Sequence, residues 1–165
     1  MDERFHPIAV GDDLVTVETS FVDPDRPEVV ELLWEMRREF DRIYGEVTTD
    51  PPPKGQFSSP RAAFLVVRYE GRLVACGAFR PWDEGTAEVK RVFVTPTLRR
   101  RGIGRLMMDK LEGQARRLGY RRMFLETGDR QSEAMEMYIS LGYRRVPCHG
   151  DKQWKGYSVC MEKTL

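Results

Sequence analysis

One turn of this 165-residue chain combines arginines and glycines in a way that suits the binding of an anion. The apolar run Val92-Phe93-Val94 is typical of a strand end, and the basic segment 99–105, which contains Gly102 and Gly104, follows shortly after it. Apolar residues at helical spacing begin at Ile103, so a helix begins inside this segment. The first N–H groups of a helix lack partners within it and carry partial positive charge, and glycine lets a ligand approach the backbone. The segment therefore predicts a cradle for a pyrophosphate.

Two common phosphate-binding motifs do not fit this turn. A dinucleotide fingerprint would require a small residue where Met107 stands, and the Gly-Lys-Ser/Thr end of a P-loop is absent. A third signature, Arg/Gln-x-x-Gly-x-Gly/Ala, is matched by Arg99, Gly102 and Gly104. A second block follows the strand-like run 124–127, and it consists of Gln131, Ala134, Tyr138, Gly142 and Tyr143.

Together the two blocks resemble the GNAT family of N-acetyltransferases, which bind acetyl-CoA, and the resemblance covers about residues 62–145. The segment from Glu126 to Gln131 is similar to small bacterial-type members. The resemblance implies a fold of the α+β class, with a single mixed, mostly antiparallel central sheet flanked by helices. It also implies an enzyme that moves an acetyl group from acetyl-CoA to a primary amine by direct transfer in a ternary complex.

The resemblance assigns cofactor binding to residues of both blocks. Backbone amides from Arg100 to Arg105 would hold the CoA pyrophosphate, and arginine side chains would add charge-assisted bonds to its oxygens, although any single arginine could instead be a solvated surface residue. The strand end would pair with the pantetheine arm, and the Val94 amide would donate to the thioester carbonyl. Gln131 stands where many members have an asparagine, and its side chain offers the same amide. The implied set is Phe93, Val94, Arg99, Arg100, Arg101, Gly102, Ile103, Gly104, Arg105, Gln131 and Tyr138.

Two side chains are candidates for catalysis. The resemblance implies that Tyr138 is the general acid that protonates the departing CoA thiolate, and a phenol with a pKa of about 10 suits that task. A tyrosine that only packs its helix against the sheet is the alternative. Glu88, in the strand before the turn, is the candidate general base for the incoming amine. Glu126 and water are further candidates, and either carboxylate could instead pair with an arginine or attract a cationic acceptor.

The elements that must position these residues follow from periodicity and turn residues. Alternation predicts a strand over 13–21, and an apolar stripe from Val29 to Ile43 predicts a helix that ends at Gly45. Residues 46–60 contain four prolines and predict a long loop. Further elements are helices over 103–118 and 134–141 and strands over 62–69, 72–79, 87–94, 121–127, 143–145 and 157–162. This order predicts one domain, 1–165, built on a mixed sheet.

Charge is unevenly distributed along a chain whose net charge is only +1. Residues 1–50 carry 14 acidic and 5 basic side chains, whereas residues 89–122 carry 11 basic and 2 acidic ones. An acidic half opposite a basic cofactor half suits a cationic amine bound between the regions 44–57 and 148–157, although a solvated acidic helix would look the same. The expected acceptor is a small-molecule or peptide amine, and a homodimer is expected by analogy alone.

Composition argues against several other classes of protein. No run of 18 apolar residues is available for a membrane span, and the charged start is unlike a signal peptide. Three cysteines do not make a disulfide framework, which indicates a reducing compartment and a cytoplasmic protein. Cys148-His149 with one further histidine offers too few ligands for a metal site, so no metal is expected. Two rival functions stay open: an acyl-CoA sensor or scaffold on the same fold, and a nucleic-acid binder, which the near-zero net charge disfavours.

Overall fold

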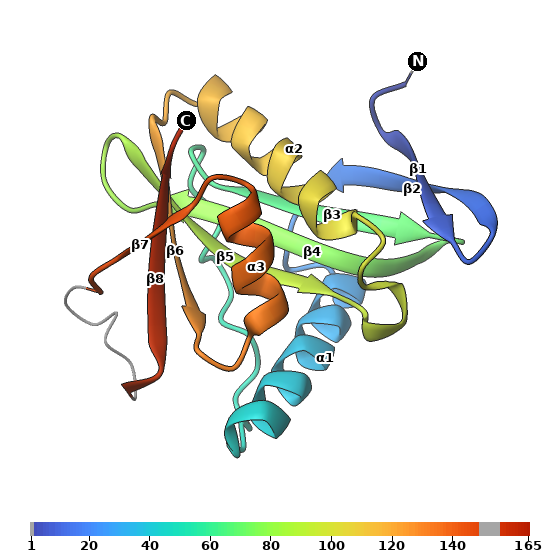
Figure 1. Cartoon of the computed structure of the whole chain (residues 1–165), viewed down its shortest axis with the longest axis horizontal. Helices are drawn as coiled ribbons and strands as arrows, with labels where there is room; N and C mark the ends of the chain where they lie inside the picture. Colours follow the sequence, from blue (N-terminus) through green and yellow to red (C-terminus); the bar gives the residue numbers. More distant parts are fainter. Residues whose placement is uncertain (1, 149–155) are drawn as a thin grey trace.

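The computed structural model describes residues 2–148 and 156–165, and within them the chain forms one eight-stranded sheet with helices on both faces (Figure 1). The spatial order of the strands is β1-β2-β3-β4-β5-β6-β8-β7. The helices are α1 (Pro27–Tyr44), α2 (Ile103–Arg117) and α3 (Ser132–Ser140), with a 3-10 turn η1 (Pro96–Leu98) before α2. The strands are β1 (Phe5–Val10), β2 (Asp13–Phe21), β3 (Ala63–Tyr69), β4 (Arg72–Pro81), β5 (Thr86–Val94), β6 (Arg122–Gly128), β7 (Arg144–Val146) and β8 (Ser158–Thr164). The prediction of a mixed, mostly antiparallel sheet flanked by helices is confirmed.

Local sequence explains where several elements begin and end. Pro27 occupies the first turn of α1, where its missing N–H costs nothing, and Gly45 ends that helix in a left-handed conformation with φ of 68°. Glu70 and Gly71 join β3 to β4 with φ of 48° and 78°, the pair of positive values that matches the twist of a hairpin. Strand β1 was not predicted, because Pro7 interrupts a short run. It is held at the sheet edge by pairing with β2.

Among the described strands, β5 and β6 are the neighbours that run parallel, and their pairing is short. They pair only over Thr86–Val89 and Arg122–Leu125, although both strands continue past these ranges. Beyond that point their carboxyl-terminal halves have no ladder between them. We call the space between these two halves the split.

Strand β5 bends where it leaves β6. The register with β4 shifts between Cys76 and Ala78, so Arg91 and Val92 lie opposite Gly77. Arg91 has a φ of +61°, a left-handed conformation that costs a non-glycine residue about 1–2 kcal/mol. A bulge of this kind bends its strand and increases its twist. The bend is the local cause of the split.

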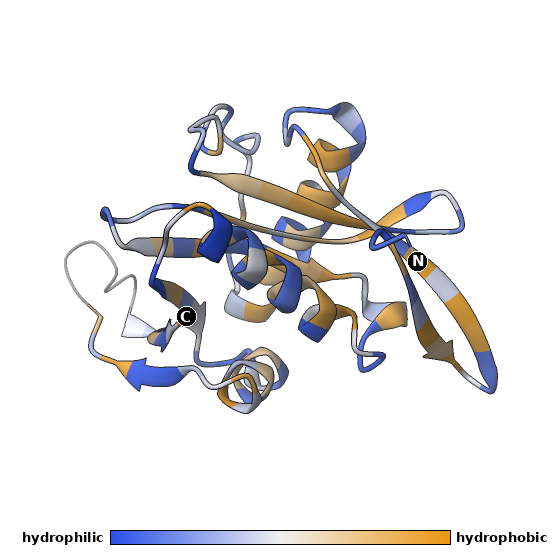
Figure 2. Ribbon diagram, turned by 90° about the horizontal axis from the view of Figure 1, so that it is seen from above, coloured by the Kyte–Doolittle hydropathy of each residue, from blue (hydrophilic) through white to orange (hydrophobic). Residues whose placement is uncertain are grey.

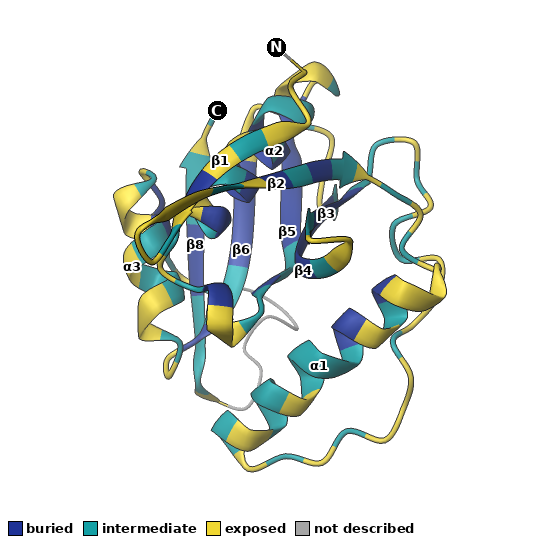
Figure 3. Ribbon diagram, turned by 90° about the vertical axis from the view of Figure 1, so that its right-hand side faces the viewer, coloured by how far each residue is buried: buried dark blue, intermediate teal, exposed yellow. Residues whose placement is uncertain are grey.

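Two apolar clusters cover the two faces of the sheet. Helices α2 and α3 pack on one face, over buried residues such as Leu65 and Phe79. Helix α1 packs on the other, which we call the α1 face, where Leu33 lies with Phe64 and Phe93. Figure 2 shows the apolar strands between helices, and Figure 3 shows that much of β5, β6 and β8 is buried. Because side chains alternate along a strand, neighbouring residues of β5 and β6 serve opposite faces.

The expectation that the cysteines form no disulfide was wrong. Cys148 and Cys160 are bonded, and Cys76 is a buried free thiol. The spacing of the two partners gave no sign of the bond, because it is the antiparallel pairing of β7 with β8 that places Val146 opposite Cys160. The inference of a reducing compartment therefore loses its basis. Within the described residues, no helix is both long enough and apolar enough to cross a membrane.

Opening this disulfide is expected to lower the free energy of unfolding. The bond joins residues 12 positions apart, and closing a loop of that size in the unfolded chain is worth about 3 kcal/mol. Cys148→Ser should therefore lower the melting temperature by about 10 °C in thermal denaturation followed by circular dichroism. Reductant should then lower the Tm of the parent chain and leave that of the variant unchanged. An equal response of both would contradict a stabilising disulfide.

Candidate active site

The end of β5 directs backbone groups into the split at Val94. The N–H of Thr95 donates to the carbonyl of Val74 in β4 at 2.8 Å. Backbone groups of successive strand residues point to opposite sides, so those of Val94 point away from β4 and toward the split. Those of Phe93 face β4, where Phe93 lies opposite Cys76. This alternation favours Val94 over Phe93 as a backbone donor to a ligand in the split.

The turn after β5 leads into α2 with the first backbone N–H groups of the helix uncapped. Gly102 precedes the helix with φ of 82°, and no side chain caps the helix start. The first turn, which begins at Ile103, contains no acidic residue. Uncapped N–H groups and the positive end of the helix dipole suit an anion here, as the sequence predicts.

Three of the predicted arginines surround this helix start. Arg100 and Arg105 are exposed and donate to side chains of α3, to Glu133 at 3.3 Å and to Ser140 at 2.6 Å. Arg101 donates to a backbone carbonyl in β1 at 3.2 Å. Exposed pairs of this kind are weak, so Arg100 and Arg105 are available to exchange them for phosphate oxygens.

Arg99 is held by the protein itself. Its Nε donates to the carbonyl of Val94 at 2.8 Å, and both terminal nitrogens donate to Glu39 of α1, Nη1 at 2.6 Å. The guanidinium also lies 5.5 Å from the centre of the Phe93 ring. These contacts direct Arg99 toward β5 and α1, so its geometry is that of a residue that fixes the strand end.

Gly104 has a packing role in addition to the predicted one. A Cβ atom at this position would lie 2.6 Å from Sδ of Met137 in α3, closer than atoms tolerate. The glycine therefore lets α2 and α3 approach each other. A larger residue at Gly104 would disturb this packing as well as ligand approach.

Helix α3 supplies Tyr138 and Gln131. Tyr138 is 5% exposed and contacts the ring of Tyr143 edge to face at 5.6 Å. It belongs to the same apolar cluster against which Val94 packs. Burial raises the pKa of the Tyr138 phenol above its ordinary value, so the phenol keeps its proton at neutral pH. Gln131 stands just before α3, where its N–H donates to the carbonyl of Gly128 at the end of β6.

Both candidate carboxylates lie on the α1 face. Glu88 is 2% exposed in β5, and its Oε1 accepts a hydrogen bond from Nε of Arg80 at 2.9 Å. Glu126 lies one residue past the last β5–β6 pair, and its Oε1 accepts from the Ser158 hydroxyl at 2.7 Å. The strand alternation thus brings the two predicted carboxylates to the same face beside the split.

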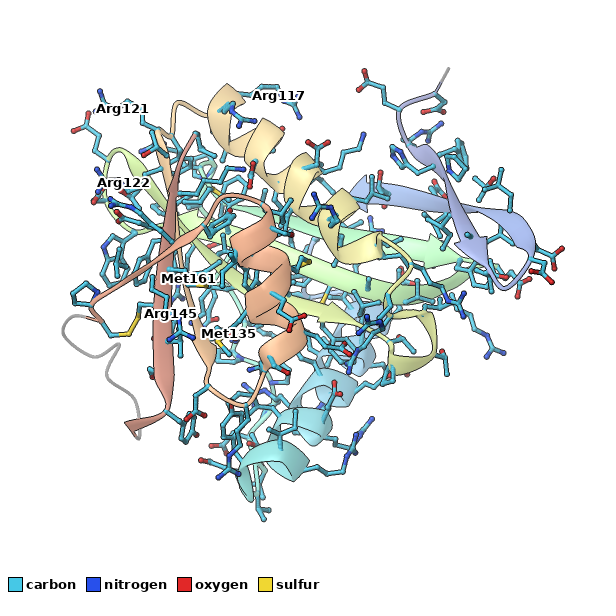
Figure 4. The ribbon with its side chains drawn as sticks, viewed as in Figure 1. Arg117, Arg121, Arg122, Met135, Arg145 and Met161 are labelled. Carbon is cyan, nitrogen blue, oxygen red and sulfur yellow. A yellow bond between two sulfur atoms is a disulfide. The ribbon has the colours of Figure 1, made fainter. Side chains whose placement is uncertain are left out.

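The basic segment 89–122 does not form one anion site. Arg117 is the last residue of α2, and Arg121 and Arg122 follow it, so all three lie far from the turn at the start of the helix (Figure 4). A helix of 15 residues is about 22 Å long, so its two ends form separate basic regions. Only the region at the amino end borders the split.

The carboxyl end of α1 also reaches the split, through contacts of Tyr44. The Tyr44 hydroxyl accepts a hydrogen bond from the N–H of Arg130 at 3.1 Å, and its ring stacks on Tyr157 at 4.2 Å. The Tyr157 hydroxyl in turn donates to Glu46 at 3.0 Å. A Cβ atom added to Gly128 would collide with the Tyr44 hydroxyl. The expected acceptor walls, 44–57 and 148–157, therefore meet at Tyr44 and Tyr157, and residues 149–155 of the second wall lie outside the described residues.

One cavity lies away from the split. It has a volume of about 350 Å³ and is lined by Trp82, Phe124, Thr86 and residues of β7 and β8. The rings of Trp82 and Phe124 stack at 5.4 Å. Phe124 is paired with Glu88 across β5 and β6, so the cavity adjoins the buried carboxylate on the α1 face.

The contact between Gly128 and Tyr44 yields a test by substitution. Gly128→Ala forces the Tyr44 ring away from β6 and is expected to lower the free energy of unfolding by about 1–3 kcal/mol in denaturant titration. Gly113→Ala, in the interior of α2, has space for its methyl group and should raise the same quantity by about 0.5–1 kcal/mol. If both changes altered the free energy of unfolding equally, the contact between Tyr44 and Gly128 would not contribute to stability.

Comparison with known proteins finds relatives along most of the chain. The model described as "Acetyltransferase (GNAT) family" matches residues 27–143. The "IAA acetyltransferase" of Azospirillum brasilense is 34% identical over 143 residues, which are 86% of this chain and 94% of that protein.

Solved structures agree with the sequence relatives. An acyl-CoA N-acyltransferase of Klebsiella pneumoniae superimposes with a TM-score of 0.76 at 27% identity, over 90% of this chain and 97% of that one. A GNAT family acetyltransferase of Elizabethkingia anophelis, crystallised with acetyl-CoA bound, superimposes with a TM-score of 0.64 at 14% identity, over 90% and 98% of the two chains. A family match across most of the sequence, on a sheet that opens between two parallel strands, makes this chain a member of the GNAT family of acetyltransferases.

Proposed function

We propose that this chain transfers the acetyl group of acetyl-CoA directly to a primary amine, with both substrates bound at once. The observation that carries the proposal is the split between β5 and β6, which opens beside the uncapped start of α2. An unpaired strand edge can bind the amide-rich pantetheine arm as an added strand would bind. The helix start can bind the pyrophosphate.

The residues around the split fit acetyl-CoA. Arg100 and Arg105 flank the helix start with exposed guanidinium groups, which suit phosphate oxygens. The N–H of Val94 points into the split and would stabilise the negative charge that develops on the thioester oxygen. Arg99, which holds the Val94 carbonyl, would keep that N–H in place. Gln131, at the end of β6, would donate to the pantetheine from the opposite strand.

The reaction needs a base and an acid on opposite sides of the reacting carbon. Glu88, or Glu126 in its place, takes a proton from the protonated amine on the α1 face, directly or through water. The amine nitrogen then forms a C–N bond with the thioester carbon, and the C–S bond breaks. Tyr138 gives its proton to the departing thiolate, a role for which a buried phenol that stays protonated is suited. The nitrogen loses its second proton to solvent, the carboxylate releases its proton to solvent, and Tyr138 is reprotonated from solvent. The products are an N-acetyl amine and CoA, with one net proton released.

Calorimetric titration with acetyl-CoA tests this cofactor assignment. The expected result is binding at one site per chain, weakened about tenfold in Arg100→Gln/Arg105→Gln because two charge-assisted hydrogen bonds are lost. Arg117→Gln, at the other end of α2, is the matched control and should bind as the parent does. Absence of binding at millimolar acetyl-CoA would refute the proposal. Binding without turnover on any amine would support a sensor on the same fold.

Tyr138→Phe tests the acid. The change removes the proton donor and leaves the ring in its apolar contacts, so kcat should fall about a hundredfold while the calorimetric Kd for acetyl-CoA stays the same. The rate is measured as release of the CoA thiol. An unchanged kcat would show that Tyr138 is not the acid and only packs α3 against the sheet.

A further inference from the structure

The α1 face of the split carries cationic groups that the transfer reaction does not use. Arg80 comes from β4, where it lies opposite Glu88, Arg91 comes from the bulge of β5, and Arg37 comes from α1. Arg91 was part of the basic segment in the sequence, where nothing distinguished it from the arginines of the turn. We call Arg37, Arg80 and Arg91 the acceptor-side arginines.

Arg91 is the central member of this group. Its backbone occupies the bulge of β5, and Nη2 donates to Oε1 of Gln56 at 3.0 Å. It lines a small cavity of about 20 Å³ between α1 and the loop that contains Gln56 and Phe57. Across the described ranges 2–148 and 156–165, no carboxylate forms an ion pair with Arg91. A largely buried guanidinium with a neutral amide as its side-chain partner is costly, because burial removes water from the charge.

The surroundings of Arg91 are cationic as well. Burial lowers the pKa of Arg91 from its ordinary value, and the charges of Arg37 and Arg80 lower it further. Arg80 is paired with Glu88, while Nη1 of Arg37 donates to the backbone carbonyl of Asp50 at 2.6 Å. Among the described groups whose charges act on Arg91, the two arginines outnumber the one carboxylate, Glu88.

Three acidic residues of α1 have partners other than Arg91. Asp41 accepts two hydrogen bonds from Thr48, each at 2.8 Å, and Glu39 is paired with Arg99. Glu28 is paired with Arg68. These three carboxylates are therefore engaged away from Arg91, while Glu35 of the same helix acts on the Cys76 thiol and on Arg99.

We propose that the acceptor is a primary amine that also carries an anionic group, a carboxylate or a phosphate, and that Arg91 binds this group with Arg37 and Arg80 beside it. The inference rests on the proposed function, since it concerns the second substrate of the same site. Guanidinium groups bind both kinds of anion through paired hydrogen bonds. Glu88 lies next to Arg80, so an amine whose anion is held by the arginines places its nitrogen on the face where the base stands.

The test compares amines that differ only in the anion. Amino acids and aminoalkylphosphonates are each paired with the amide or ester that lacks the charge, and kcat/KM is measured by thiol release at saturating acetyl-CoA. Members that carry the anion should be favoured about 10- to 100-fold, and the carboxylate and phosphonate arms identify the preferred group. Equal values within the pairs, preference for the neutral members, or no turnover on any anionic amine would overturn the inference. Calorimetric binding of acetyl-CoA, measured first, separates this result from a failure of the proposed function.

Two variants assign the preference to Arg91. Gln56→Glu places a carboxylate next to the Arg91 guanidinium, and the changed residue lies in a loop outside the sheet. This variant should lose most of the preference for the anionic amine, while its kcat/KM for the neutral amine changes little. Arg91→Lys keeps one charge without the paired donors and should retain part of the preference. Arg117→Gln is the control and should retain all of it. An undiminished preference in Gln56→Glu, with the parent's melting temperature, would show that Arg91 does not bind the anion.

Discussion

The short pairing of β5 with β6 is the constraint on which the rest of the site depends. Parallel strands normally continue side by side, and here the ladder ends after Val89 and Leu125. The bulge at Arg91 turns β5 away, at the cost of a left-handed residue in a strand. The open edge of β5 begins at this distortion. The backbone groups of Val94 point toward that edge, and the side chain of Arg91 lies on the α1 face.

Helix α1 contacts both sides of the split. On β5 it holds Arg99 through Glu39, and Arg99 holds the Val94 carbonyl. On β6 it places the Tyr44 hydroxyl against Gly128. The two contacts lie more than one helical turn apart on the same helix, so α1 acts as a rigid spacer between the two strand ends. Helix α1, an element that contributes no predicted catalytic group, thus connects the two sides of the opening.

Periodicity was sufficient to predict the order of elements from β2 onward, because those segments alternate or repeat at helical spacing in the sequence itself. Glu88 and Glu126 became candidates through the resemblance to the family and the strands they occupy, and in the structure both lie on the α1 face. The contacts of Arg99, the meeting of Tyr44 with Tyr157 and the bond between Cys148 and Cys160 could not be predicted. Each joins segments far apart in the chain or depends on strand register, which local pattern does not encode. The positive φ of Arg91 gave no signal either, since arginine has no preference for it.

The state of the cysteines has a consequence for how turnover can be followed. Burial raises the pKa of the Cys76 thiol to about 12, so almost none of it is thiolate at neutral pH, and the thiolate is the form that reacts. The two remaining cysteines are bonded to each other and offer no thiol. The folded, oxidised protein therefore does not react with thiol reagents. Every thiol detected during a reaction with acetyl-CoA then belongs to the CoA product. Reductant carried over from purification would reduce the bond between Cys148 and Cys160, and the two thiols formed would compete with CoA for the reagent.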